Sequence, residues 1–160
     1  MATDILSSES HRADNNKTEN LVLIWIDPSA NSDENLNAQQ NLTSIYKNVK
    51  AFTSVVDGEN AIQQWTRTNE VILIVSGEFG RELVPRIHRL EQLLTIYIFC
   101  IERENHIQWA KEYSKIKALV IKLDRLVSII ESDHEQRINK KAEELIAVPN
   151  PSLNSGLLIK

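Results

Sequence analysis

Four polar or small residues stand where apolar runs of the chain end, and their types could hold an ion. They are Asp27 after 21–26, Ser76 and Gly77 after 71–75, and Lys122 after 118–121. Carboxylates bind cations, whereas a lysine, a hydroxyl and glycine N–H groups bind phosphate. These four residues form our candidate ligand- or anion-binding site. The favoured alternative is that they cap helices and close loops, as the strand ends of any parallel sheet require.

The segment Ser-Gly-Glu-Phe-Gly at 76–80 could bind a phosphate at a helix N-terminus through backbone N–H groups. It lacks the lysine and the glycine spacing of a Walker A loop, and it is not G-x-G-x-x-G. Glu78 would also repel a phosphate. A tight strand-to-helix turn is therefore the favoured interpretation of this segment.

The remaining reactive residue types suggest neither catalysis nor metal binding. His88 and His106 have no histidine, cysteine or paired carboxylate at metal-ligand spacing, so we predict no metal site. Cys100 lies inside the apolar run 96–101, which favours a core thiol over a nucleophile. We accordingly predict no catalytic residue and no cofactor.

Composition limits the classes of partner and compartment. The 160 residues suffice for one folded domain, and a net charge of −4 disfavours non-specific binding to nucleic acid or to an anionic membrane. No apolar run approaches the roughly 20 residues that cross a bilayer, and the polar N-terminus has no signal-peptide core. With one cysteine in the chain, a reducing, cytoplasmic location is expected.

The apolar runs before the candidate residues predict the fold. Short β-branched runs alternate five times with helical patterns, which favours a doubly wound, five-stranded parallel α/β sheet. The expected strand order is the flavodoxin-like 2-1-3-4-5, in three α/β/α layers. The predicted strands are 21–26, 49–56, 71–75, 96–101 and 118–121. The predicted helices are 34–46, a short one opened by an Asp57 N-cap, 80–94, 104–113 and 123–146.

Polar composition predicts a disordered arm at 1–19 and a linker or flexible tail at 148–160, on either side of a folded domain at 20–147. Within helix 80–94, Pro85 is expected in the first turn and a half, where proline costs less. The arginines of that helix are expected on its polar side, as a solvated face or a partner-binding surface.

The layout resembles a response-regulator receiver domain over about residues 20–147. Three features carry the resemblance: Leu-Val-Leu-Ile-Trp-Ile-Asp at 21–27, Val-Asp-Gly-Glu-Asn-Ala-Ile at 56–62, and Lys122 after the fifth strand. In receivers the first feature leads into an acidic pocket, the second opens the second helix, and the lysine follows strand five. The resemblance implies a flavodoxin-like fold.

Departures from the receiver pattern bear on the activity that the resemblance implies. Receivers carry an acidic pair after strand one, whereas here Asp27 stands between Ile26 and Pro28. Ser76 replaces the phosphoacceptor aspartate, Cys100 or Ile101 replaces the expected Thr or Ser, and Leu123 replaces the usual proline. Receiver phosphorylation needs a carboxylate nucleophile and a carboxylate-bound Mg²⁺. We therefore expect no autophosphorylation.

Three further stretches are similar to the N-terminal module of bdelloid rotifer multidomain proteins that carry mono-ADP-ribosyltransferase or tetratricopeptide domains. They are Leu-Ile-Val-Ser-Gly at 73–77, Val-Pro-Arg-Ile-His at 84–88 and Gln-Trp-Ala-Lys-Glu at 108–112. This resemblance implies that the chain is the N-terminal module alone or a short relative of it, with any catalytic domain lying outside these residues. No Glu-x-Glu of the transferase type follows a suitable strand, so no transferase activity is assigned here.

Three functional hypotheses follow. The first is a non-catalytic pseudo-receiver that regulates a protein partner or neighbouring domain, through the helices at 80–94 and 104–113 and the polar end of the last helix. The second is a small-ligand or nucleotide-binding domain with its site at the carboxyl edge of the sheet. The third is an enzyme resembling TIR-type NAD-cleaving domains, for which Glu78 and Glu82 are loose candidates.

Overall fold

The computed structural model describes residues 20–65 and 69–146. The predicted arm at 1–19 and tail at 148–160 lie outside the described residues. The chain divides into two compact units, Met1–Ser128 and Ile129–Lys160, and each is considered by itself. The second unit, as far as it is described, is the continuation of one helix. Among the described residues, no helix combines the length and the apolar character that spanning a membrane requires.

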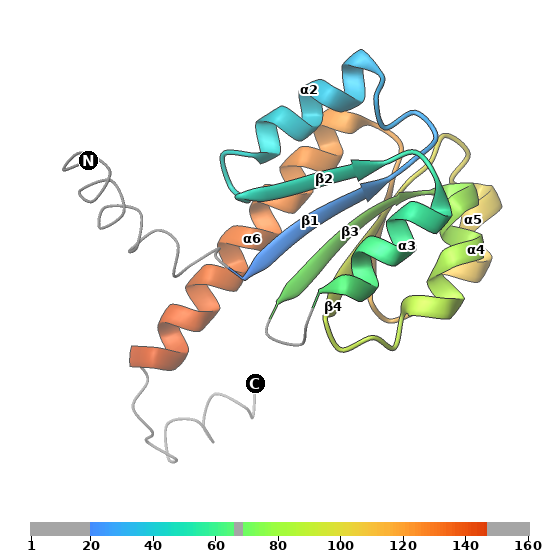
Figure 1. Ribbon diagram of the computed structural model, residues 1–160. Helices are drawn as coiled ribbons and strands as arrows, with labels where there is room; N and C mark the ends of the chain where they lie inside the picture. Colours follow the sequence, from blue (N-terminus) through green and yellow to red (C-terminus); the bar gives the residue numbers. More distant parts are fainter. Residues whose placement is uncertain (1–19, 66–68, 147–160) are drawn as a thin grey trace. The chain divides into compact units, whose positions relative to one another are not determined.

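Strands and helices alternate along the described chain (Figure 1). The strands are β1 (Leu21–Ile26), β2 (Asn48–Phe52), β3 (Glu70–Ser76), β4 (Leu93–Phe99) and β5 (Ile116–Val120). The helices are α2 (Asp33–Leu42), α3 (Val55–Gln64), α4 (Gly77–Ile87), α5 (Glu104–Ala110) and α6 (Leu123–Ile146).

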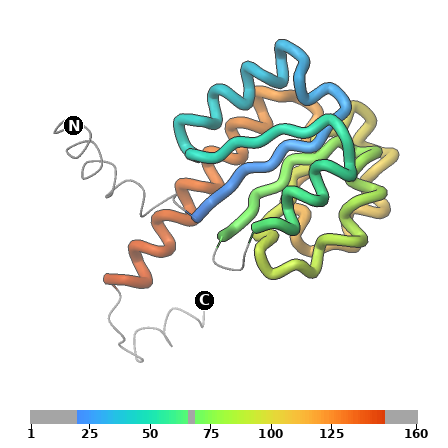
Figure 2. Tube along the Cα trace, in the orientation of Figure 1, coloured from blue at the N-terminus to red at the C-terminus, as the bar shows by residue number. Residues whose placement is uncertain are grey.

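All neighbouring strands of the sheet are parallel, in the order β2-β1-β3-β4-β5. The predicted doubly wound order 2-1-3-4-5 is confirmed. Figure 2 shows β1 running between β2 and β3, two segments that are distant from each other in sequence. The register places Ile24 beside Lys50 on one side and Leu73 on the other. The more polar β2 is an edge strand of the sheet.

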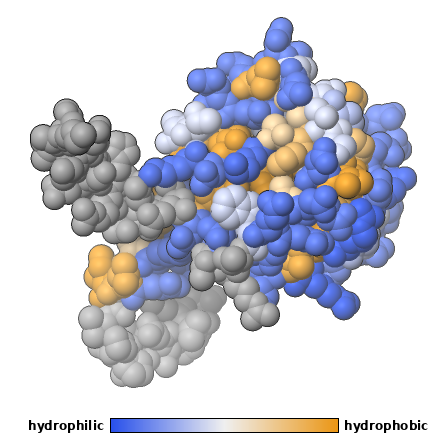
Figure 3. Space-filling view, in the orientation of Figure 1, coloured by the Kyte–Doolittle hydropathy of each residue, from blue (hydrophilic) through white to orange (hydrophobic). Residues whose placement is uncertain are grey.

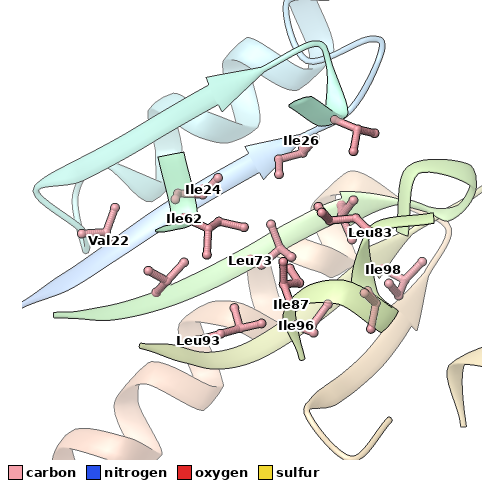
Figure 4. Close-up of a cluster of buried hydrophobic side chains, with 14 of the residues drawn as sticks. Val22, Ile24, Ile26, Ile62, Leu73, Leu83, Ile87, Leu93, Ile96 and Ile98 are labelled. Carbon is pink, nitrogen blue, oxygen red and sulfur yellow. The ribbon is translucent and has the colours of Figure 1, made fainter. Parts of the chain in front are cut away.

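The core lies on both faces of the central strands. All six residues of β1 and five consecutive residues of β3 are buried, as parallel strands covered on both faces require. Alternate strand residues pack with apolar residues of α3 and α4 in one cluster (Figure 4). Figure 1 shows α2 on the opposite face of the sheet, where Trp25 is completely buried.

The boundary between β2 and α3 differs from the predicted one. We expected a strand at 49–56 and an N-cap at Asp57; the strand is present but ends four residues earlier, and the N-cap prediction is wrong. The strand ends at Phe52, and Ser54 is the N-cap: its hydroxyl accepts a hydrogen bond from the Asp57 N–H at 3.1 Å. A serine in extended conformation satisfies an otherwise unpaired N–H of the first turn. Val55 therefore begins the helix and turns its side chain into the core.

Helix α4 begins three residues earlier and ends seven residues earlier than the predicted 80–94. The chain leaves the helix at His88, so Leu93 and Leu94 belong to β4. Pro85 consequently lies near the C-terminal end of the helix, not in its first turns. There it removes one helical hydrogen bond, the one that would reach the carbonyl of Arg81.

The other helix and strand ends shift by a few residues. The structure ends α2 at Leu42 and α5 at Ala110, earlier than predicted, and it starts β5 at Ile116. Cys100 follows β4 instead of lying inside it, although it is buried and its N–H still bonds to the carbonyl of Val120 at 3.0 Å. The thiol therefore borders the carboxyl edge of the sheet.

Two arginines on the polar side of α4 bind groups on the neighbouring helices. Arg86 pairs with Glu59 of α3 at 2.7 Å, and Arg81 donates to the carbonyl of Asn105 in α5 at 2.6 Å. The exposed ion pair between Arg86 and Glu59 contributes little stability by itself. Both arginines are thus engaged inside the fold, although the sequence left open that they form a partner-binding surface.

Truncating a central strand residue should destabilise the fold far more than truncating an exposed one. Ile74 is fully buried in β3, whereas Ile121 is 51% exposed. We expect Ile74→Ala to lower the free energy of unfolding by about 2–5 kcal/mol, because it removes buried methyl groups and leaves a cavity. Ile121→Ala, the matched control, should change it by less than about 1 kcal/mol. Urea unfolding followed by circular dichroism measures both, and similar losses would contradict the described core.

Candidate functional site

A hollow of about 300 Å³ lies at the carboxyl ends of β1, β3 and β4. Three of the four predicted site residues, Asp27, Ser76 and Gly77, line it. The rest of its lining is Pro28, Ser29, Asn35, Glu78, Phe99, Cys100, Ile101, Glu102 and His106. The fourth predicted residue, Lys122, is exposed after β5 and is not part of this lining. The fold therefore gathers three of the four residues at the edge where open α/β sheets bind ligands.

Asp27 is the buried acid of the hollow. It is 6% exposed, and its Oδ1 accepts a hydrogen bond from the Ser29 N–H at 2.7 Å. Burial raises the pKa of this carboxyl, and the bond from Ser29 offsets part of that rise. A positive charge at the hollow would stabilise the ionised carboxylate.

Ser76 stabilises the start of the helix that follows it. It is the N-cap of α4, and its Oγ accepts a hydrogen bond from the Phe79 N–H at 3.4 Å. Capping satisfies one N–H of the first helical turn. The helix-capping interpretation of this residue thus has direct support, and its hydroxyl is engaged with backbone.

Position 77 has no space for a side chain, because the ring of the buried His106 lies against the glycine. A Cβ at this position would come within 2.4 Å of Nε2 of His106, a distance that real Cβ atoms do not reach. No glycine in the described residues has a positive φ, so the constraint at Gly77 is space and not backbone conformation. The residue lets the imidazole reach the edge of the sheet.

Sequence reasoning missed His106, which is 4% exposed and lines the hollow. Its Nδ1 accepts a hydrogen bond from Nε1 of Trp109 at 3.0 Å. Because a ring nitrogen that accepts carries no proton, the proton of this imidazole is on Nε2. Nε2 lies 3.8 Å from a carboxylate oxygen of Glu78. The His106–Trp109 spacing of three residues at a helix start was the available signal.

Asn35 was also missed. It is 4% exposed, and its Nδ2 donates to the carbonyl of Ser29, which fixes the orientation of the amide. Its Oδ1 is buried and has no hydrogen-bond partner among the described residues. An unpaired buried acceptor costs about 1–3 kcal/mol. Gln39, one turn later in α2, donates to the carbonyl of Ala30 at 2.8 Å, so both amides anchor the loop after β1.

The chemistry of the hollow is acidic. Three carboxylates line it, those of Asp27, Glu78 and Glu102, and its lining among the described residues includes no lysine or arginine. Burial raises the pKa of the Cys100 thiol, partly opposed by the charge of Arg103. A raised pKa is the opposite of what an activated cysteine nucleophile requires. Across the part of the chain that the structure describes, no three His, Cys, Asp or Glu residues are grouped to hold a metal ion.

The contact between Gly77 and His106 can be tested by a double-mutant cycle. Gly77→Ala should lower the free energy of unfolding by about 1–3 kcal/mol, because the new methyl group overlaps a buried ring. In a His106→Ala background the same change should cost much less, since the ring is gone. Gly80→Ala is the control, because its Cβ would meet side-chain atoms only at 3.2 Å. An equal cost of Gly77→Ala in both backgrounds, measured by urea unfolding, would refute the contact.

Comparison with known proteins adds no relative: no family model matches the chain, and searches of curated proteins and of solved structures find no match either.

Proposed function

We propose that the chain is a receiver-like module without phosphotransfer chemistry, which acts by binding a protein partner or a neighbouring domain. The observation that carries the proposal is at the end of β3. Ser76 stands there in place of a carboxylate, and its hydroxyl caps α4. A phosphoryl acceptor and a second acid beside Asp27 are what receiver chemistry needs. The parallel sheet in the order 2-1-3-4-5 supports the likeness in layout.

A groove beside the edge strand β5 supplies a surface for such a partner. It measures about 370 Å³ and is lined by residues of α5, of β5 and of the turn between them. Its apolar lining is Ile107, Ala110, Tyr113, Ile116, Ala118 and Leu119. Arg103, Lys111 and Lys117 contribute basic side chains to the same groove. This combination favours an extended segment of a partner protein that is apolar and acidic, because its charge would complement the three cations.

The position of this groove agrees with a partner surface that includes α5. Figure 3 shows only small, separate hydrophobic patches among hydrophilic residues on the face in view. Ile101, which is 88% exposed, and Ile121 lie outside the lining of the groove and follow β4 and β5, the two strands that α5 connects along the chain. Exposed apolar residues grouped at one edge mark interaction sites more often than scattered ones do.

The absence of phosphotransfer is directly measurable. With acetyl phosphate and Mg²⁺, the protein should incorporate no more phosphoryl group than an Asp27→Asn/Ser76→Ala variant does, as read by intact-mass spectrometry. The reason is that Ser76 offers no carboxylate nucleophile. Stable incorporation that disappears on changing Asp27 or Ser76 would overturn the proposal.

The groove predicts which peptides the module selects. Peptides selected on the protein from a random displayed library should be enriched in Asp or Glu beside apolar residues. Lys111→Glu should weaken the best of them about tenfold in fluorescence anisotropy, since it reverses one complementary charge. Lys50→Glu, at another exposed lysine on the opposite edge strand β2, is the control. Selected peptides without acidic residues, or equal losses in both variants, would count against this surface. Self-association in sedimentation would identify a second copy as the occupant instead.

A further inference from the structure

The groove beside β5 gathers positive charge on a chain that is acidic overall. Its lining includes the exposed side chains of Arg103, Lys111 and Lys117 and, among the described residues, no Asp or Glu. The whole chain carries a net charge of −4. Apolar side chains of α5, of β5 and of the turn between them make up most of the remaining lining. An occupant that complements this groove therefore combines carboxylates with aliphatic side chains in a short stretch.

The chain itself carries such a stretch. Three segments lie outside the described residues, at 1–19, 66–68 and 147–160. The second is Thr-Arg-Thr and the third has no Asp or Glu, whereas the first contains Asp-Ile-Leu-Ser-Ser-Glu at 4–9. Of the three, only the first places carboxylates on either side of two adjacent aliphatic residues. Its residue types match what the groove selects.

The tether of this segment is long enough to reach the groove. The carbonyl of Asn20 accepts a hydrogen bond from the Glu70 N–H at 2.7 Å, so the chain enters the sheet at the amino end of β1. Because parallel strands begin at one edge, the start of β5, with Ile116 in the groove lining, lies at this same edge. β5 is three strand spacings from β1, or about 14 Å. The ten residues at 10–19 can span up to about 33 Å, and both strands belong to the unit Met1–Ser128.

We propose that the segment 4–9 binds the β5 groove of its own chain and competes there with the partner. The inference rests on the proposed function, to which it adds a regulation of the partner site. Ile5 and Leu6 supply aliphatic surface for the apolar lining, and the carboxylates of Asp4 and Glu9 complement its three cations. A tether of this length gives an effective concentration of about 1 mM. At that concentration, a segment that binds with a Kd of about 0.1 mM occupies the groove about ten times as often as it leaves it empty.

Paramagnetic relaxation in the full 160-residue chain tests this contact without any partner. A nitroxide is attached at Ser8→Cys in a Cys100→Ala background, which leaves one thiol in the chain. The amides of Ile107 and Lys117, which line the groove, should lose most of their signal intensity relative to the reduced sample. Val49 of β2 is the internal reference, because β2 neighbours β1 and lies nearer to the attachment of the segment. Broadening at Val49 equal to that at the groove would show an arm without a preferred site and overturn the inference.

Charge reversal in the same chain identifies what holds the segment. Asp4→Lys/Glu9→Lys should abolish the broadening at the groove, because both complementary charges are reversed. Asp14→Lys/Glu19→Lys makes the same change of net charge outside the segment and should leave the broadening intact. Undiminished broadening in the first variant, or an equal loss in the second, would reject the assigned contact. Broadening passed from labelled protein to a separate isotope-labelled copy would place the segment on a second chain and also overturn the inference.

Partner binding gives a second readout. The Asp4→Lys/Glu9→Lys variant should bind the peptides selected on the groove about tenfold more tightly than the unchanged chain, because the competing segment is removed. Asp14→Lys/Glu19→Lys should bind them as the unchanged chain does, which separates competition from general charge attraction. Equal affinities of the first variant and the unchanged chain would contradict competition. If peptides are selected but the segment causes no broadening, the inference fails and the proposed function stands. If broadening appears but no peptide is selected, the proposed function fails while the contact within the chain is established.

Discussion

The structure depends on the burial of β1 and β3 on both faces. Every side chain of β1 is buried, so its backbone groups must pair within the sheet and find no water. Polar side chains can then be accommodated only where these strands end. That constraint places Asp27 and Ser76 at one edge, together with the loops and helix starts that follow each strand. The position of the candidate site is thus a consequence of the core.

Close packing at that edge shapes the hollow. Gly77 has no side chain, so His106 lies against the start of α4, and Trp109 fixes the tautomer of its ring. On the other side Ser29 holds the carboxylate of Asp27 and the amide of Asn35. The Ser76 Oγ accepts the Phe79 N–H as the cap of α4, and the charged side chains of the lining are acidic.

Much of the architecture could be predicted from short-range patterns. The β-branched runs at 21–26 and 71–75 and the spacing of the helical stripes are sufficient for a parallel sheet with its strand order. The ends of the elements were less predictable, because Ser54 and Ser76 cap their helices where two other starts were plausible. Leucines at 93 and 94 fit a helical stripe and a buried strand equally well. Only the pairing of β4 with β3 distinguishes the two.

Sequence alone determined that Asp27, Ser76 and Gly77 share one edge, because the carboxyl ends of parallel strands that neighbour one another must meet there. Tertiary structure decided which side chains join them. Asn35 and His106 come from α2 and α5, and their burial beside the strand ends depends on how those helices pack, which no local pattern records. It also decided that Lys122 stays outside the lining. Without Lys122, the charged side chains of the lining are the three carboxylates of Asp27, Glu78 and Glu102.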